Sequence, residues 1–363
     1  MGWSSVQFLE SGDSYYRALL EEFRRAKTSI LMESYIFEVD RVGREVLEGL
    51  CEAQGRGVKV FLRVDGIGSM GNIKEIIEFC DQRTLELEIF HPLPFAPEGN
   101  YFSVGFAKVD NFLTRWRLIN RRTHRKLVII DERVAFTGGR NVKEDQSERF
   151  AGQEAWHDLS LRLEGEGVDE LVDAFWFHPT KGKEFRDCLF NYSFRLRQRR
   201  NHWLEHQIRN AKKRVWITTP YFAPTPTMLL DLRRTARRGV DVRFVFTRKI
   251  DVLVSKLAAR GLYRRLLRWG VKVHEYEPRL LHRKMWVVDD LAIVGSANFN
   301  YRSLIHDLEV DVILRQPDRV AKAMELSLAD QLDSRVISLA DMKKVNPIKR
   351  FASWIAGWFT YWL

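Results

Sequence analysis

The sequence predicts an α/β protein built from two similar α/β/α halves, in each of which helices flank a mixed sheet. The first observation is length: 363 residues exceed what one hydrophobic core usually organises, and roughly 150 residues per domain suggests two domains. The second is that apolar runs of strand length alternate with helical stretches through short links marked by glycine. The third is an internal repeat of about half the chain, which assigns one such unit to each half.

Each half begins with the same three elements: a buried strand, a helix that ends near a glycine, and a second strand. They span 29–37, a helix ending at Gly57 and 58–64 in the first half, and 214–222, a helix ending at Gly239 and 240–246 in the second. This order is typical of parallel βαβ units. We expect halves over 1–194 and 203–342, a solvated basic connector over 195–202, and a terminal helix within 343–363.

Each half then reaches a predicted β-hairpin with the same polar residues at matched spacing. In the first, His124 and Lys126 precede four apolar residues and Asp131, and Asn141 follows; in the second, the same pattern is His282, Lys284, Asp289 and Asn298. Side chains alternate along a strand, so the histidine and lysine share a face and the arginine between them points to the other. The two aspartates stand about five residues of roughly 3.3 Å further along, so we expect them to hold the hairpin.

Two histidines and two lysines on facing surfaces could bind a phosphodiester and catalyse a reaction at its phosphorus atom. The lysines, with the amides of Asn141 and Asn298, would neutralise the phosphate oxygens and the charge of a five-coordinate transition state. One neutral histidine would attack phosphorus and form a phosphohistidine, while the other would protonate the leaving alcohol and then deprotonate the incoming one. A single His-x-Lys pair is common on protein surfaces and need not have a function. Two matched copies in a repeat that spans the chain favour a catalytic role. This scheme needs no metal and no cofactor.

The net charge indicates the class of partner, and the cysteine content indicates the redox compartment. The formal net charge of +11 favours a polyanion, either nucleic acid or an anionic lipid surface. The three cysteines form no C-x-x-C pair and leave one over, which supports neither a disulfide framework nor a zinc site. We expect a reducing compartment, no secretory signal and no membrane-spanning segment, because charges interrupt every stretch before about 18 apolar residues accumulate.

The carboxyl end predicts a short amphipathic helix. Helical spacing places six apolar residues on one stripe: Phe351, Trp354, Ile355, Trp358, Phe359 and Trp362. Thirteen residues rise only about 20 Å, too little for a ~30 Å hydrocarbon core, so we expect the helix to lie in the membrane interface with Lys349 and Arg350 near anionic headgroups. The alternative is that the stripe packs on the protein or on another copy. The aromatic insertion within 92–123 has the same two interpretations.

The paired motifs resemble the two signature motifs of the phospholipase D superfamily. The sequences that flank them resemble bacterial cardiolipin synthases of the short form, which lacks amino-terminal membrane helices. The resembling pieces are Glu33 to Phe37, Asp65 to Ser69, Asn120 to Thr123, Arg162 to Gly165, Thr219 to Pro224 and Asn298 to Ser303. The resemblance covers nearly the whole chain.

The resemblance implies one active site at the interface of the two halves and transfer of a phosphatidyl group from one phosphatidylglycerol to a second, or to a related alcohol. It makes His124 the nucleophile and His282 the acid and base, although the symmetry of the sequence leaves the order open. Asp158 and Glu309 would hydrogen-bond the far ring nitrogens of the histidines, and Ser296 would join Asn141 and Asn298 in holding phosphate. One departure is Asp307, where the family usually has Asn.

These features lead us to expect a peripheral enzyme on the cytoplasmic face of the bacterial inner membrane that binds phosphatidylglycerol. The alternatives are a phospholipase D-type hydrolase or a nuclease that uses water, and a lipid-binding scaffold with a dead site. The aromatic terminal segment makes nucleic acid an unlikely partner, because a DNA groove does not need it. Two intact motifs argue against the scaffold.

Overall fold

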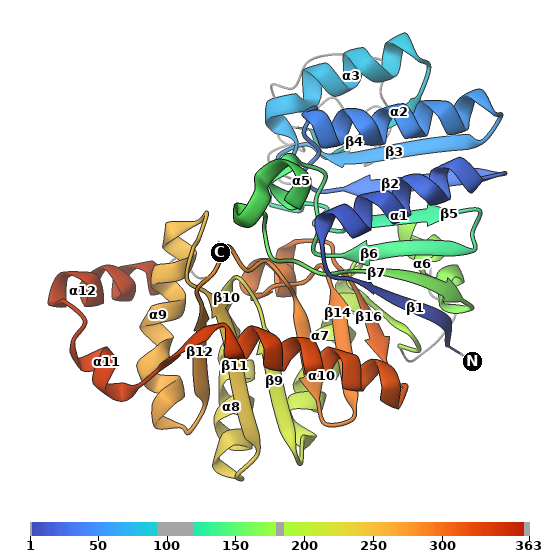
Figure 1. Cartoon of the computed structure of the whole chain (residues 1–363). Helices are drawn as coiled ribbons and strands as arrows, with labels where there is room; N and C mark the ends of the chain where they lie inside the picture. The colour runs from blue at the N-terminus through green and yellow to red at the C-terminus, as the bar shows by residue number, and fades with distance from the viewer. Residues whose placement is uncertain (1, 93–119, 179–184, 359–363) are drawn as a thin grey trace. The chain divides into compact units, whose positions relative to one another are not determined.

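The computed structural model describes residues 2–92, 120–178 and 185–358, except for the side chains of Lys349 and Arg350 (Figure 1). The chain divides into two compact units. The first consists of Met1–Tyr192 with His306–Asp311, and the second of Ser193–Ile305 with Val312–Leu363. A short segment late in the sequence therefore belongs to the first unit.

The first unit contains a mixed sheet with the strand order β1-β7-β6-β5-β2-β3-β4. The strands are β1 (Trp3–Leu9), β2 (Ser29–Ser34), β3 (Lys59–Asp65), β4 (Glu86–Phe90), β5 (Leu127–Ile130), β6 (Val134–Gly138) and β7 (Ser160–Gly165), and β8 (Cys188–Phe190) follows along the chain. β2, β3 and β4 are parallel, as the βαβ pattern predicts, whereas β5 and β6 form the expected antiparallel hairpin.

Helices cover both faces of this sheet. The longer ones are α1 (Gly12–Arg25), α2 (Arg41–Gly55), α3 (Ile73–Gln82) and α6 (Gly167–Phe175), with short turns at Met70–Asn72, Glu144–Gln146, α5 (Glu148–Ala151) and Gly152–Glu154. Ser11 and Asp40 cap α1 and α2 by accepting backbone N–H groups of the first turn. The first three long helices share one core with Ile30 and Met32 of β2, while α6 contacts β5 and β7.

The second unit repeats this plan. The strands after residue 193 run in the order β17-β12-β11-β9-β13-β14-β16 within an eight-stranded sheet, so β9, β11 and β12 correspond to β2, β3 and β4, and β13, β14 and β16 correspond to β5, β6 and β7. The strands are β9 (Arg214–Thr218), β11 (Asp241–Thr247), β12 (Lys272–Tyr276), β13 (Met285–Val288), β14 (Leu291–Gly295), β16 (Val310–Leu314) and β17 (Ser334–Ile337), and β10 (Phe222–Ala223) pairs with β15 (Phe299–Asn300). The predicted α/β fold of two similar halves is confirmed.

The helices of the second unit are α7 (Phe194–Asn210), α8 (Pro226–Arg237), α9 (Leu253–Arg268), α10 (Pro317–Leu332), α11 (Leu339–Lys343) and α12 (Pro347–Ala356), with a π-turn at Arg302–His306. The basic stretch 195–202 lies inside α7, so the prediction of a solvated connector is wrong. Leu196 and Arg200 are buried there, because one face of the helix packs on the protein while the remaining arginines lie on the other faces.

Two short helices follow β17, and the second, α12, lies within the range 343–363 where a terminal helix was predicted. Asn346 and Pro347 start α12, because the asparagine side chain accepts the Ile348 N–H and proline suits the first turn. α12 contacts α9. Phe359 and Trp362, like most of the aromatic insertion, lie outside the described residues. No helix in the described ranges has the length and apolar character needed to cross a bilayer.

The aspartate of each motif anchors its hairpin to the start of the neighbouring parallel strand. Asp131 accepts the backbone N–H groups of Lys27, Thr28 and Ser29 at 2.7–3.1 Å. Asp289 accepts those of Lys212, Lys213 and Arg214 at 2.8–3.0 Å. Both aspartates have left-handed backbone, with φ of 52° and 49°, a conformation that Asp tolerates better than most residues. These bonds lower the pKa of both carboxyls.

We expect Asp131→Ala and Asp289→Ala each to lower the free energy of unfolding by about 1–2 kcal/mol, because three backbone donors lose their acceptor. The corresponding Asn variants keep one acceptor oxygen and should lose less. Since the folded pKa lies below the usual 3.8, the stabilisation persists at neutral pH and disappears only as pH falls below that value. Urea denaturation at pH 7 and pH 3 measures both effects. Equal stability of the Ala variants and wild type at pH 7 would contradict this role.

Candidate active site

The segment that carries His124 is held in extended form by a strand-like pairing within the first unit. Thr123 forms a parallel bridge with Leu308. The His124 N–H donates to the Leu308 carbonyl at 3.0 Å, and the Leu308 N–H donates to the Arg122 carbonyl at 2.8 Å. β5 begins only at Leu127 and β13 only at Met285, so each His-x-Lys precedes its strand instead of lying within it. The first motif pairs there with the segment 306–311.

This pairing brings Glu309 to His124. Nδ1 of His124 lies 3.0 and 3.1 Å from the two carboxylate oxygens, and both side chains are buried. A carboxylate only accepts hydrogen bonds, so the proton of a neutral imidazole resides on Nδ1. Nε2 then carries the free lone pair. The contact that the resemblance implied for Glu309 is therefore present in the first unit.

Asn191 holds the backbone on either side of this contact. Its Oδ1 accepts the Glu309 N–H at 2.7 Å, and its Nδ2 donates to the Asp307 carbonyl at 2.7 Å. Asn191 is fully buried. It was missed in the sequence because it lies outside the repeated motifs and no pattern marks it.

Burial lowers the pKa of His124 below its usual 6.5. Glu309 opposes this shift by stabilising the imidazolium, Lys126 adds to it by repulsion, and Asp307 gives a smaller opposing contribution. The extra negative charge of Asp307 thus raises the pKa, as its position suggests, but desolvation outweighs it. His124 is neutral at neutral pH.

The two lysines adopt the same local geometry. Lys126 Nζ donates to the His124 carbonyl at 2.6 Å, and Lys284 Nζ donates to the His282 carbonyl. An aromatic ring stands beside each histidine: the centroid of Tyr35 is 4.8 Å from that of His124, and the centroid of Tyr221 is 6.4 Å from that of His282. The tyrosines were not predicted as site residues, although each comes shortly after a strand that the repeat predicts: Tyr35 directly after β2 and Tyr221 three residues after β9.

The arginine of each motif points away from the histidine into a buried ion pair. Arg125 Nη2 lies 2.9 Å from Glu33, and Arg283 Nη1 lies 2.9 Å from Asp330. Glu33 also accepts the hydroxyl of Thr123. The alternation predicted from strand geometry is therefore present. Each arginine anchors its His-x-Lys segment on the side opposite the histidine.

The second motif differs from the first at the ring nitrogen. Nδ1 of His282 lies 2.8 Å from Nζ of Lys284. An ammonium only donates, so this nitrogen acts as an acceptor. His124 thus presents Nδ1 to a carboxylate, whereas His282 presents Nδ1 to an ammonium.

The supporting polar residues also lie at the ends of the hairpins. Asn141 Oδ1 accepts the Ile36 N–H at 3.2 Å, which leaves its NH₂ group as the donor. Asn298 is buried, and its Oδ1 has no hydrogen-bond partner among the described residues. Ser296 is fully buried directly after β14.

Asp158 lies against Gly139, where a Cβ atom would come within 2.1 Å of its Oδ1. Only glycine permits this approach, which explains the Gly-Gly before Arg140. Asp158 Oδ1 accepts the Leu159 N–H at 2.7 Å, and Arg140 donates to the Asp158 carbonyl at 2.8 Å. The pairing of Asp158 with a histidine stays a prediction.

The predicted site residues fall into two sets. The first unit holds His124, Lys126, Asn141, Asp158 and Glu309, and the second holds His282, Lys284, Ser296 and Asn298. Asp131 and Asp289 lie at the opposite ends of β5 and β13. Within the described ranges, no group of three or more His, Cys, Asp or Glu side chains could hold a metal ion. A shared active site of the two halves stays a prediction.

Sequence comparison identifies relatives of the whole two-unit chain. A family model described as cardiolipin synthase, PLD-like domain, matches residues 19–150 and again 204–330, once in each half. Cardiolipin synthase 2 of Bacillus cereus is 32% identical over 346 residues, which cover 89% of this chain and 63% of the relative. Cardiolipin synthase B of Salmonella typhi is 30% identical over 370 residues, 95% of this chain and 84% of the relative. This chain thus spans less than two thirds of the Bacillus relative.

Comparison of structures supports the fold. The phosphatidylserine synthase of Haemophilus influenzae superposes with a TM-score of 0.75 over 99% of this chain and 95% of its own, at 14% identity. At that identity the likeness concerns the fold alone. The match of the family model in both halves and the identity to relatives over most of the chain agree with the duplicated motifs: this chain belongs to the cardiolipin synthase family of phospholipase D-like proteins.

Proposed function

We propose that this protein makes cardiolipin from phosphatidylglycerol by transferring a phosphatidyl group through a covalent phosphohistidine. Relatives at about 30% identity that are named cardiolipin synthases support the substrate class. The observation that carries the mechanism is the Glu309 carboxylate at Nδ1 of a buried, neutral His124. It orients the ring with a free lone pair on Nε2 and stabilises the positive charge that the ring acquires on bonding to phosphorus.

In the proposed reaction, Nε2 of His124 attacks the phosphorus of one phosphatidylglycerol. The bond from phosphorus to the glycerol headgroup breaks, and His282, protonated on both ring nitrogens once Lys284 Nζ has moved from Nδ1 to the phosphate, gives its Nε2 proton to the leaving oxygen. The hydroxyl of a second phosphatidylglycerol then gives a proton to His282 as its oxygen attacks phosphorus, which releases His124. Lys126 and Lys284 stabilise the negative charge on the phosphate oxygens in both steps, with Asn141, Ser296 and Asn298 as further donors. The products are cardiolipin and glycerol.

The contrast between the two histidines supports His124 as the nucleophile. A carboxylate at Nδ1 raises the basicity of Nε2 and favours the charged phosphohistidine, whereas an ammonium at Nδ1 does the reverse. The symmetry of the sequence motifs did not decide this order.

We expect His124→Ala and His282→Ala each to abolish cardiolipin formation in phosphatidylglycerol vesicles, with thermal unfolding close to wild type. Mass spectrometry of the lipids separates the outcomes: cardiolipin indicates transfer to an alcohol, and phosphatidic acid would indicate a hydrolase. Nicking of plasmid DNA in a parallel gel would indicate a nuclease. After acid-free quenching during turnover, ³²P from labelled lipid should be bound to the wild-type protein and absent from the His124→Ala protein. Label retained by the His124→Ala protein would assign the covalent bond to another residue.

We expect Glu309→Gln to reduce kcat by roughly 10²- to 10⁴-fold, because the amide cannot stabilise the charged ring. The carboxylate raises the pKa of His124, so its removal lowers that pKa further and moves the acid limb of the kcat/KM profile to lower pH. Asp307→Asn is the matched control: it also removes one negative charge, so its limb should move the same way by less, with a small loss of kcat. An acid limb unchanged in both variants would show that His124 does not govern it.

We further propose that α12 binds the cytoplasmic surface of the bacterial inner membrane. Ile348, Phe351 and Ile355 recur at i, i+3 and i+7, which places them along one side of the helix, and all three are exposed. Of the predicted membrane residues, Trp354, Ile355 and Trp358 are described and exposed. The anionic substrate and the net charge of +11 agree with a peripheral mode of binding.

We expect the triple variant Ile348→Ser, Phe351→Ser and Ile355→Ser to bind phosphatidylglycerol vesicles at least about tenfold more weakly, since each buried apolar side chain contributes roughly 1.5–3 kcal/mol. Exposed residues of this kind add little to folding, so thermal stability should stay the same. Co-sedimentation measures binding. The control is Leu328→Ser with Leu332→Ser on α10, two leucines that are also exposed, at 40% and 86%. Unchanged sedimentation of the triple variant would refute membrane binding by this helix.

A further inference from the structure

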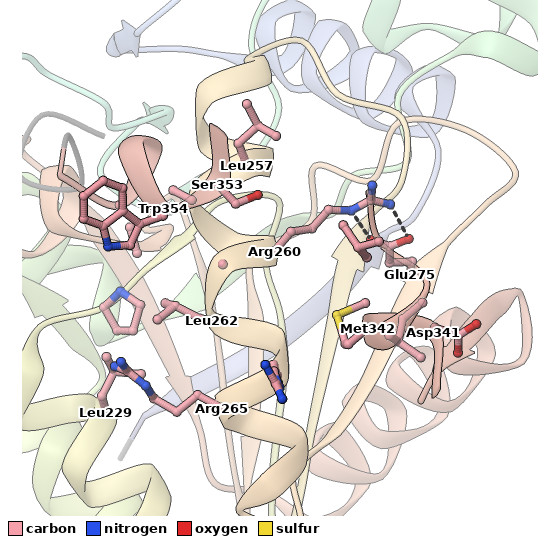
Figure 2. Close-up of a pocket in the computed structure, with 18 of the residues that line it drawn as sticks. Leu229, Leu257, Arg260, Leu262, Arg265, Glu275, Asp341, Met342, Ser353 and Trp354 are labelled. Carbon is pink, nitrogen blue, oxygen red and sulfur yellow. Dashed lines mark hydrogen bonds and ion pairs between the residues drawn. The ribbon is translucent and has the colours of Figure 1, made fainter. Parts of the chain in front are cut away.

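A cavity of about 870 Å³ lies in the second unit, among α8, α9, α11, α12 and β17 (Figure 2). None of the residues that line it belongs to a His-x-Lys motif. Apolar walls come from Leu229 of α8, Leu257 and Leu262 of α9, Trp354 of α12 and Trp358 just after α12. A volume of this size is typical of sites for ligands of several tens of atoms.

The character of the cavity changes along α9. Leu257, Gly261, Arg264 and Arg265 all line it and recur at i, i+4, i+7 and i+8, the spacing of one helical face. Over these eight positions the helix rises about 12 Å, from an apolar end to a basic end. Figure 2 shows Leu257 at one end and Arg265 at the other, with Trp354 alongside. One wall is thus itself amphipathic.

The arginines of the cavity fall into two groups, and Lys344 is a further cation of its lining. Arg260 is bound to Glu275 by two hydrogen bonds of 2.9 and 3.0 Å, and Arg335 is bound to Asp341. Arg264 and Arg265 form no ion pair with any described residue, and both are exposed at the basic end. Their charges are therefore available for an anion.

We propose that this cavity binds one anionic phospholipid molecule, with an acyl chain against Leu257, Leu262 and Trp354 and the phosphate beside Arg264 and Arg265. A ligand with an apolar tail and an anionic head matches the order of wall residues, whereas a free phosphate would leave the apolar end unfilled. The lipid site is additional to the reaction proposed above.

Close packing keeps α12 in place as a wall of this site. A Cβ atom at Gly261 would lie 3.2 Å from the carbonyl oxygen of Ser353, so the glycine permits the two helices to approach. Ala356, three residues after Ser353, is buried, while Trp354 and Trp358 stay exposed beside the cavity. The two tryptophans can therefore report on an acyl chain that enters.

Quenching of tryptophan fluorescence by phosphatidylglycerol with short, brominated acyl chains, kept below its critical micelle concentration, tests the site. The measurement uses the full chain carrying His124→Ala, so that the probe is not consumed. We expect saturable quenching that the double variant Trp354→Phe with Trp358→Phe removes. Arg264→Glu with Arg265→Glu should weaken binding by about tenfold or more, as expected for basic residues near an anionic headgroup. Arg237→Glu with Arg268→Glu, which changes the net charge equally outside the cavity, should not.

Three results would overturn the proposal. Equal quenching by brominated phosphatidylcholine would show that the arginines do not select an anionic head. Full competition by inorganic phosphate would show that the basic end binds phosphate without a lipid chain. Unchanged quenching in the Arg264→Glu, Arg265→Glu protein, or in a Leu257→Glu protein that melts like wild type, would place the lipid elsewhere. Because no turnover is needed, these outcomes are independent of whether the protein makes cardiolipin.

Discussion

The buried ion pair behind each His-x-Lys motif is the interaction on which the rest of the site depends. Arg125 with Glu33, and Arg283 with Asp330, place one charged pair beneath each segment that carries a histidine. Such pairs contribute little net stability, because desolvation offsets their attraction, but removing one partner leaves an unpaired buried charge at a cost of about 3–5 kcal/mol. The arginine therefore cannot leave its side of the segment. Its neighbours His and Lys are held on the opposite side.

The second constraint is that the first unit is completed by chain from the second half of the sequence. Residues 306–311 pair beside Thr123 and deliver Glu309 to a histidine 185 positions earlier. Asn191 then fixes the backbone of this segment through both Asp307 and Glu309. The nucleophile that we propose is therefore oriented only when both halves of the chain are present.

The local features were predictable and the long-range ones were not. Strand periodicity and glycine links predicted β2 to β3, β9 to β11 and both hairpins, because these depend on neighbours in sequence. The sequence did not reveal Asn191 or the cavity, since tertiary contacts between distant elements create them. Resemblance suggested Glu309, but no spacing rule connects it to His124. The prediction of a solvated connector at 195–202 was wrong because it assumed that every residue of the charged run faces solvent. Arg200 of this run is fully buried.

The terminal helix shows why a wide apolar stripe need not have one partner. From the sequence, the apolar stripe was expected to pack either on a membrane or on the protein itself. In the structure α12 packs on α9 at Gly261, and its Ala356 is buried, so part of the helix is a protein contact. Ile348, Phe351 and Ile355 stay exposed on a side that neither lines the cavity nor touches that contact at Gly261. A ten-residue helix has room for both functions because 3.6 residues per turn place Trp354 and Ile355 about 100° apart.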